Sequence, residues 1–184
     1  MRYINLILYI LLSVFFSTNI FSNEKIISEL QKGGNIIFIR HALAPGNGDP
    51  DNINLNDCST QRNLNKMGIE QSKKIGKYFK ENNIPIDLVL SSEWCRCKDT
   101  AKYAFESFET FKALNSFYDE KFYKFKKQQI INLKKYIKSW NGDKNLVLVT
   151  HYVVILEMMS IGVLSGEIVA TKKNLELIGR LNIF

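Results

Sequence analysis

The stretch that decides the fold is residues 35–41, Asn-Ile-Ile-Phe-Ile-Arg-His, an apolar run that ends in two polar side chains. A short run that is apolar on both faces is typical of a parallel strand buried in the middle of a sheet. A second such run, Leu-Val-Leu-Val-Thr at 146–150, is followed by His151. In α/β proteins ligands bind beyond the carboxyl ends of the strands, so both histidines of the chain are expected at one ligand site.

The residue types at these strand ends point to an anionic group that is attacked by histidine. A neutral imidazole nitrogen is a good nucleophile near neutral pH, and His41 lies directly after Arg40. The planar guanidinium of arginine makes paired hydrogen bonds to phosphate oxygens. The competing interpretation is that His41 and His151 are unrelated polar residues at two strand ends.

Outside these two runs, predicted strands alternate with predicted helices. Gly33-Gly34 should end a first helix, Asn65 should cap the next one, and Pro85 should break it. The alternation predicts an α/β fold, a three-layer α/β/α sandwich with a mainly parallel central sheet. The segment 152–160 is apolar nearly all round and is expected to be buried. Strands are expected at 35–40, 86–90 and 146–150, a short strand within 108–114, helices at 24–31, 66–83, 91–105, 125–140 and 152–160, and a hairpin at 166–171 and 175–181.

The first 22 residues are typical of a secretory signal. Arg2 precedes an apolar stretch at 4–16, and a polar, small-residue segment leads to a cleavage position near Ser22. An uncleaved amino-terminal anchor is the alternative. Removal of the signal would leave 23–184 as a single domain without a membrane span, located in the periplasm or secreted.

The net charge and the cysteines narrow the possible classes of function. The formal net charge is +7, with many lysines at 121–138, which indicates a solvated helix face or an attraction to anionic substrates or lipid. No zinc-finger or basic heptad pattern indicates a nucleic-acid partner. In an exported protein the three cysteines predict one disulfide, of Cys58 with Cys95 or Cys97, and one free thiol. Their spacing does not suit a metal site.

Four short motifs occur in a fixed order along the chain. Together they resemble the histidine phosphatase superfamily, whose fold is phosphoglycerate mutase-like, and the resemblance covers nearly all of 23–184. The motifs are Arg40-His41-Ala42, Gln61-Arg62-Asn63-Leu64, Ser91-Ser92-Glu93-Trp94-Cys95-Arg96 with Thr100-Ala101, and Thr150-His151.

The resemblance implies a role for each matching residue. His41 matches the histidine that becomes phosphorylated, and Arg40, Arg96 and His151 match its phosphate pocket. Two further residues, Asn47 and Arg62, are expected on the substrate side. The arginines would supply the charge compensation, so no metal ion or other cofactor is expected.

Two positions depart from the family pattern and leave the proton donor unassigned. Tyr152 stands where one branch carries aspartate, and Ser116 stands where the mutase branch carries glutamate. The candidate donors are acidic residues elsewhere in the chain, namely Asp119, Glu120, Asp49 and Asp57. A donor matters less when the leaving group is already acidic.

The whole stretch from His41 to Arg62, with Asp-Cys-Ser-Thr-Gln-Arg-Asn-Leu at 57–64, looks like a small exported subgroup of the superfamily, which also carries the Trp-Cys-Arg-Cys found at 94–97. The expected function is therefore an exported phosphatase that hydrolyses phosphomonoesters through phospho-His41. Its partner would be a small phosphorylated substrate or a phosphorylated envelope component. The alternatives are a non-catalytic phosphate-binding member of the same fold and a mutase, for which the chain is short.

Overall fold

The fold is organised around a mixed six-stranded sheet with the strand order β3-β2-β4-β1-β5-β6. A computed structural model describes residues 23–184. The first four strands in this order run parallel to one another. β5 is antiparallel to β1, and β6 is antiparallel to β5, so these two strands form the predicted carboxyl-terminal hairpin. The strands are β1 (Ile36–Arg40), β2 (Ile86–Ser91), β3 (Glu109–Thr110), β4 (Asn145–Thr150), β5 (Ile168–Thr171) and β6 (Leu177–Leu181).

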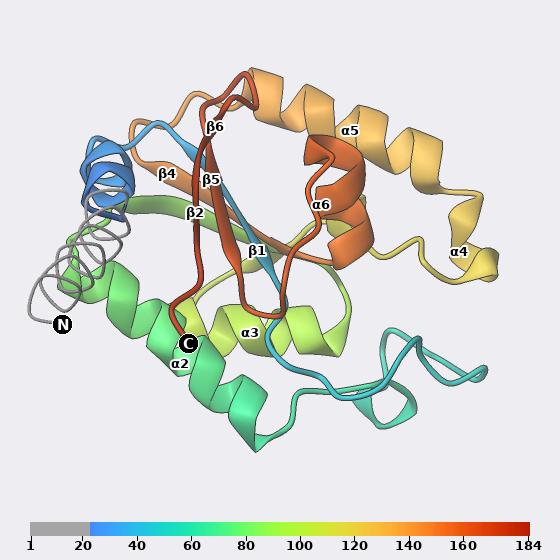
Figure 1. Ribbon diagram of the computed structural model, residues 1–184. Helices are drawn as coiled ribbons and strands as arrows, with labels where there is room; N and C mark the ends of the chain where they lie inside the picture. Colours follow the sequence, from blue (N-terminus) through green and yellow to red (C-terminus); the bar gives the residue numbers. More distant parts are fainter. Residues whose placement is uncertain (1–22) are drawn as a thin grey trace, which may run out of the picture.

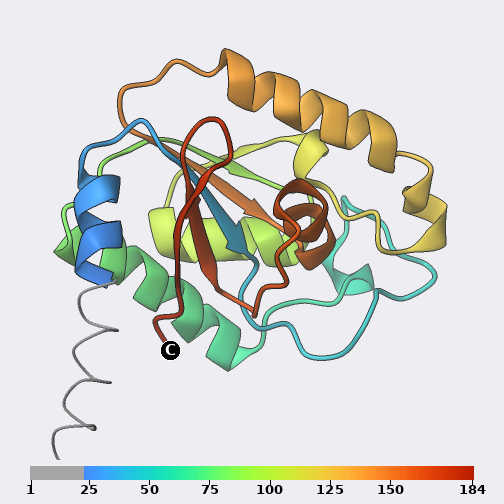
Figure 2. The ribbon, with the colours of Figure 1, turned by 45° about the horizontal axis from the view of Figure 1, so that its top comes forward.

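Helices cover both faces of the sheet, which confirms the expected α/β sandwich. In Figures 1 and 2, α2 and α3 lie on one face, and α5 and α6 lie on the other. Residues 23–31 are also helical and pack on the α2 side through Ile26 and Leu30. The helices are α2 (Lys66–Glu81), α3 (Cys95–Phe105), α4 (Glu120–Tyr123), α5 (Lys126–Ser139) and α6 (Tyr152–Met159), with 3-10 turns η1 (Cys58–Thr60) and η2 (Lys112–Leu114).

The alternation of side chains along β1 divides the core into two layers. Ile37 and Ile39 pack in the cluster on the α2 and α3 face, and Ile36 and Phe38 pack in the cluster under α5 and α6. All four side chains are fully buried. A central strand that is apolar on both sides is what two covered faces require.

The start of α2 fixes the chain close to the end of β1. Asn65 caps the helix, as predicted, by accepting a hydrogen bond from the backbone N–H of Gly68 at 2.9 Å. The Asn65 N–H donates to the carbonyl of Leu43 at 3.3 Å. A Cβ at position 68 would lie 2.2 Å from that carbonyl oxygen, so only glycine allows this approach.

One expectation is confirmed, one is wrong, and one is not tested. The short strand expected within 108–114 is present as β3, which has two residues because the chain turns into η2. Helix α6 is not buried all round, since Tyr152 is 39% and Leu156 is 40% exposed. The predicted signal at 1–22 lies outside the described residues. Among the helices within 23–184, none combines the length and the apolar character that crossing a membrane requires.

The α5 layer allows a matched test of the core. Leu133 is fully buried between α5 and the sheet, and the adjacent Lys134 is exposed. Leu133→Ala should lower the free energy of unfolding by about 2–5 kcal/mol, because it leaves a cavity. Lys134→Ala should change it by less than about 0.5 kcal/mol. Urea denaturation followed by circular dichroism measures both, and equal effects would contradict this packing.

Candidate active site

The parallel pairing of β1 with β4 brings the two histidines together. Arg40 and Thr150 are register partners, and the His41 N–H donates to the Thr150 carbonyl at 2.9 Å. The two imidazole rings that follow are edge to face with centroids 5.5 Å apart. Both histidines are only 3% exposed.

One ring nitrogen of His41 has its proton fixed by a backbone carbonyl. Nδ1 lies 2.8 Å from the oxygen of Ala42, and a carbonyl can only accept. Nδ1 therefore carries the hydrogen, and Nε2 of the neutral ring has a free lone pair. The Arg96 Nε–H donates toward this nitrogen at 3.3 Å.

Thr100 explains why the Arg96 helix lies against the end of β1. The Ala42 N–H donates to Thr100 Oγ1 at 3.0 Å, and the hydroxyl donates to the Arg96 carbonyl at 2.7 Å. Thr100 is fully buried. The Thr-Ala part of the sequence motif thus links the loop after His41 to helix α3.

His151 is held by a chain of polar residues from the segment after β2 and the loop after η2. The Asn115 Oδ1 accepts from the Glu93 N–H at 2.9 Å, which fixes the amide orientation. The Ser92 hydroxyl donates to the same oxygen at 3.1 Å and lies 2.8 Å from His151 Nε2. His151 Nε2 therefore donates to Ser92, and its buried Nδ1 has no partner among the described residues. Nδ1 of this tautomer carries a lone pair and can accept a hydrogen bond from a ligand.

The other two arginines of the site are anchored by backbone carbonyls. Arg40 Nη1 donates to the Val163 carbonyl at 2.8 Å, and its guanidinium lies 5.4 Å from the centre of the Tyr152 ring. Arg62 Nε donates to the Gly48 carbonyl at 2.8 Å, and its Nη1 donates to the Ala44 carbonyl. Both guanidiniums keep further N–H groups available for an anion.

These groups line one cavity of about 280 Å³. Positively charged arginines and neutral histidines form one side of the cavity, and aromatic side chains form another. In residues 23–184 no cluster of three or more His, Cys, Asp or Glu has the arrangement of a metal site. The lining consists of Arg40, His41, Asn47, Gly48, Asp49, Arg62, Trp94, Arg96, Ser116, Tyr118, Asp119, Phe122, His151, Tyr152 and Val153.

The electrostatics of the cavity keep both imidazoles neutral. Burial lowers the pKa of His41 and of His151 well below the usual range, and the charge of Arg96 lowers both further. Burial also lowers the pKa of Arg40 and Arg62. An unprotonated His41 Nε2 surrounded by guanidiniums can attack an anion that the same guanidiniums attract.

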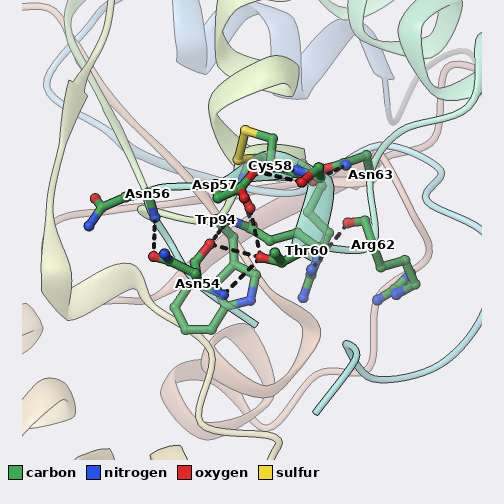
Figure 3. The surroundings of a disulfide bond; sticks show 12 residues. Asn54, Asn56, Asp57, Cys58, Thr60, Arg62, Asn63 and Trp94 are labelled. Atoms are coloured by element: carbon green, nitrogen blue, oxygen red, sulfur yellow. Dashed lines mark hydrogen bonds between the residues drawn. A yellow bond between two sulfur atoms is a disulfide. The ribbon is translucent and has the colours of Figure 1, made fainter. Parts of the chain in front are cut away.

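A disulfide ties the cavity loop to α3. Cys58 is bonded to Cys95, with Cα atoms 5.7 Å apart, so the predicted bridge is confirmed and its partner is Cys95 (Figure 3). The Cys95 N–H also donates to Gln61 Oε1 at 2.9 Å. Cys97 is the free, fully buried cysteine, and burial raises the pKa of its thiol to about 12.

The proposed proton donors lie in different places. Asp49 and Asp119 line the cavity, whereas Glu120 and Asp57 do not. Asp57 instead caps η1 by accepting from the Ser59 N–H and hydroxyl, beside the disulfide (Figure 3). Both substrate-side candidates, Asn47 and Arg62, line the cavity.

Several residues at the site were not singled out from the sequence. Ser92 orients His151, and the fully buried Trp94 ring packs 5.3 Å from the His151 ring. Phe122 is different, because the sequence allowed two interpretations of the aromatic segment 117–125, packing under a loop or a wall of the pocket. Phe122 packs on Trp94 at 5.1 Å, and Tyr118 and Phe122 of this segment line the cavity. The signal for Ser92 was its place in the Ser-Ser motif, four residues before Arg96.

The cysteine arrangement predicts a simple thiol count. The denatured, unreduced protein should contain one free thiol, from Cys97, and the reduced protein should contain all three. Titration with a chromogenic thiol reagent in guanidinium measures both. Three free thiols before reduction would contradict the bridge.

The buried histidines predict a loss of stability on acidification. The folded-state pKa of each is below the unfolded value of about 6.5, so below that pH the unfolded chain binds more protons. The free energy of unfolding should therefore fall from pH 7 to pH 5 by up to about 1 kcal/mol per pH unit for each histidine. Urea denaturation at several pH values measures this. The same slope in a His41→Gln/His151→Gln variant would contradict the assignment.

Comparisons with known proteins agree with this geometry. A family model described as the histidine phosphatase superfamily (branch 1) matches residues 36–122. Curated proteins give no match to the sequence.

Solved structures share the fold over most of the chain. The protein histidine phosphatase SixA complexed with tungstate is 14% identical, with a TM-score of 0.62, over 80% of this chain and 96% of that one. A phosphoglycerate mutase from Thermus thermophilus is 16% identical, with a TM-score of 0.58, over 82% and 99% of the two chains. The family match and the shared fold agree with the motif order, and residues 36–122 are assigned to the histidine phosphatase superfamily.

Proposed function

We propose that this protein is an exported phosphatase that hydrolyses phosphomonoesters through a phosphohistidine on His41, without a metal ion. The observation that carries the proposal is the fixed tautomer of His41, whose Nδ1–H is held by the Ala42 carbonyl. Its Nε2 lone pair lies at the cavity, 3.3 Å from the Arg96 Nε. The disulfide and the predicted signal support the exported location.

In the first step the phosphoryl group binds among the arginines as a monoanion, whose P–OH group donates to the lone pair of His151 Nδ1. The Arg96 Nε–H turns its hydrogen bond from His41 to a phosphoryl oxygen, and the His41 Nε2 lone pair attacks phosphorus. The P–N bond forms while the bond from phosphorus to the ester oxygen breaks. Guanidinium charges stabilise the equatorial oxygens, as phosphoryl transfer requires.

In the second step water replaces the imidazole. A water oxygen attacks phosphorus, the P–N bond breaks, and inorganic phosphate leaves with neutral His41 restored. The departing oxygen of the first step takes its proton from solvent or from the protonated carboxyl group of Asp119, which lines the cavity. Asp119 also caps α4, since its Oδ1 accepts from the Lys121 N–H at 3.1 Å.

The shape of the cavity bears on the substrate. A space of about 280 Å³ with Trp94, Tyr118, Phe122 and Tyr152 in its wall suits a small phosphate ester with a flat leaving group. The substrate is then a small phosphorylated molecule or a phosphorylated envelope component. SixA was solved in complex with tungstate, a tetrahedral oxyanion of the same shape as phosphate, and this supports an oxyanion as a ligand of the present chain.

The second candidate function is phosphate binding without catalysis. It is favoured by Ser116, a buried residue at the cavity where the mutase branch carries a glutamate. The pocket of arginines and histidines would remain, and the chain would bind a phosphorylated molecule without turning it over.

Turnover with and without the nucleophile separates the two functions. The purified protein should hydrolyse p-nitrophenyl phosphate in the presence of EDTA, and His41→Ala should reduce kcat at least about a thousandfold, because the P–N bond can no longer form. Asp143→Asn, an exposed change in the loop before β4 and at the opposite end of that strand, is the matched control and should retain wild-type rates.

Phosphoenzyme trapping completes the test. Labelled substrate should leave phosphate on the wild-type protein after rapid quenching and none on His41→Ala. Phosphate binding without turnover across a panel of aryl, sugar, nucleotide and acyl phosphates would instead favour the non-catalytic function.

A further inference from the structure

The cavity holds a buried ion pair between Arg96 and Asp49, and the Asp49 carboxylate has no part in the chemistry described above. Arg96 and Asp49 form a paired contact, with Nη1 2.7 Å from Oδ1 and Nη2 3.0 Å from Oδ2. The side chains are 4% and 9% exposed. Asp49 comes from the loop after β1, and Arg96 comes from the first turn of α3.

A guanidinium has two edges that can each make paired hydrogen bonds. Asp49 takes the end that carries Nη1 and Nη2, whereas the side edge begins at Nε, which faces His41 Nε2 at 3.3 Å. The side edge also includes the second hydrogen of Nη2. The carboxylate therefore fixes the rotation of the guanidinium and leaves the edge nearest the nucleophile for a phosphoryl oxygen.

Every neighbour of the Asp49 carboxylate is a hydrogen-bond donor. Oδ1 accepts from Arg96 and from the Arg62 N–H at 3.0 Å, and Oδ2 accepts from Arg96 and from the Trp94 Nε1–H at 3.1 Å. A proton on either oxygen would face another hydrogen. These contacts argue against Asp49 as the proton donor considered from the sequence.

We propose that Asp49 is a positioning residue for phosphoryl transfer, which aims the Nε edge of Arg96 at the group on His41. It also balances one charge among Arg40, Arg62 and Arg96, so the cavity can keep three guanidiniums close together. The inference rests on the proposed function. The opposite possibility is that Asp49 occupies the place of the phosphate and has to leave before substrate binds.

Asp49→Asn tests the inference because it keeps the shape of the side chain and removes its charge. The amide also turns one acceptor into a donor against Arg96 or Trp94. We expect kcat/KM for p-nitrophenyl phosphate and for phenyl phosphate to fall by a similar factor, about 10–100-fold, because misdirection of Arg96 affects both alike. Asp143→Asn is the control.

The leaving-group comparison separates positioning from acid catalysis. Loss of a proton donor would slow phenyl phosphate, the poorer leaving group, far more than p-nitrophenyl phosphate. That selective loss would overturn the inference, as would an unchanged rate with both esters.

A double-variant cycle tests whether Asp49 acts through Arg96. In an Arg96→Ala background, Asp49→Asn should lower kcat/KM by no more than about threefold, because there is no guanidinium left to aim. Multiplicative losses would contradict positioning. If Asp49→Asn does not fold, Arg96→Lys is measured in its place. A lysine has no two fixed edges with which to hold Asp49 and a phosphoryl oxygen together. The loss of kcat/KM in Arg96→Lys should therefore approach the loss in Arg96→Ala.

Anion binding keeps this test independent of turnover. Calorimetry with tungstate should show weaker binding to Asp49→Asn than to the wild type, by about tenfold, even if no ester is hydrolysed. Tighter binding by the variant would identify Asp49 as a competitor for the phosphate and overturn the inference. If the wild-type protein binds tungstate but hydrolyses no ester, the result would count against the proposed function and not against the positioning role.

Discussion

The parallel pairing of β1 with β4 is the constraint on which the rest of the site depends. Their shared register sets Arg40 beside Thr150, so each following histidine leaves its strand at the same edge of the sheet. Because β4 is buried along its whole length and β1 is buried as far as Ile39, a slip of one residue would draw the polar Arg40 at the end of β1 toward the core. The distance between the two imidazoles is therefore fixed by the most strongly packed part of the molecule.

The strands and their polar ends could be read from the sequence because local patterns specify them. Short apolar runs predicted β1, β2 and β4, and the Asn65 cap predicted where α2 begins. The position of His41 and His151 at one edge followed from the parallel arrangement alone. The family resemblance contributed Arg96, which no periodicity points to.

Contacts that depend on the path of a long loop could not be read in this way. Asp49 meets Arg96 across 47 positions, and only the folded loop shows that its carboxylate is held between Arg96, Trp94 and the backbone of Arg62. The choice between Cys95 and Cys97 depends on which side of α3 faces Cys58, since two residues apart on a helix point to different sides. The exposure of Tyr152 and Leu156 depends on what covers α6, which its apolar composition does not state.

Some residues of the site are held in place by the sheet, and others belong to a loop that the Cys58–Cys95 disulfide holds in place. His41 and His151 are held by the sheet, and their spacing is indifferent to the state of Cys58 and Cys95. Asp49 and Arg62 belong to the segment that this bridge fastens to α3. A copy of the protein that folds in a reducing compartment would thus keep its nucleophile in register while losing a covalent restraint on the loop that orients its anion-binding groups.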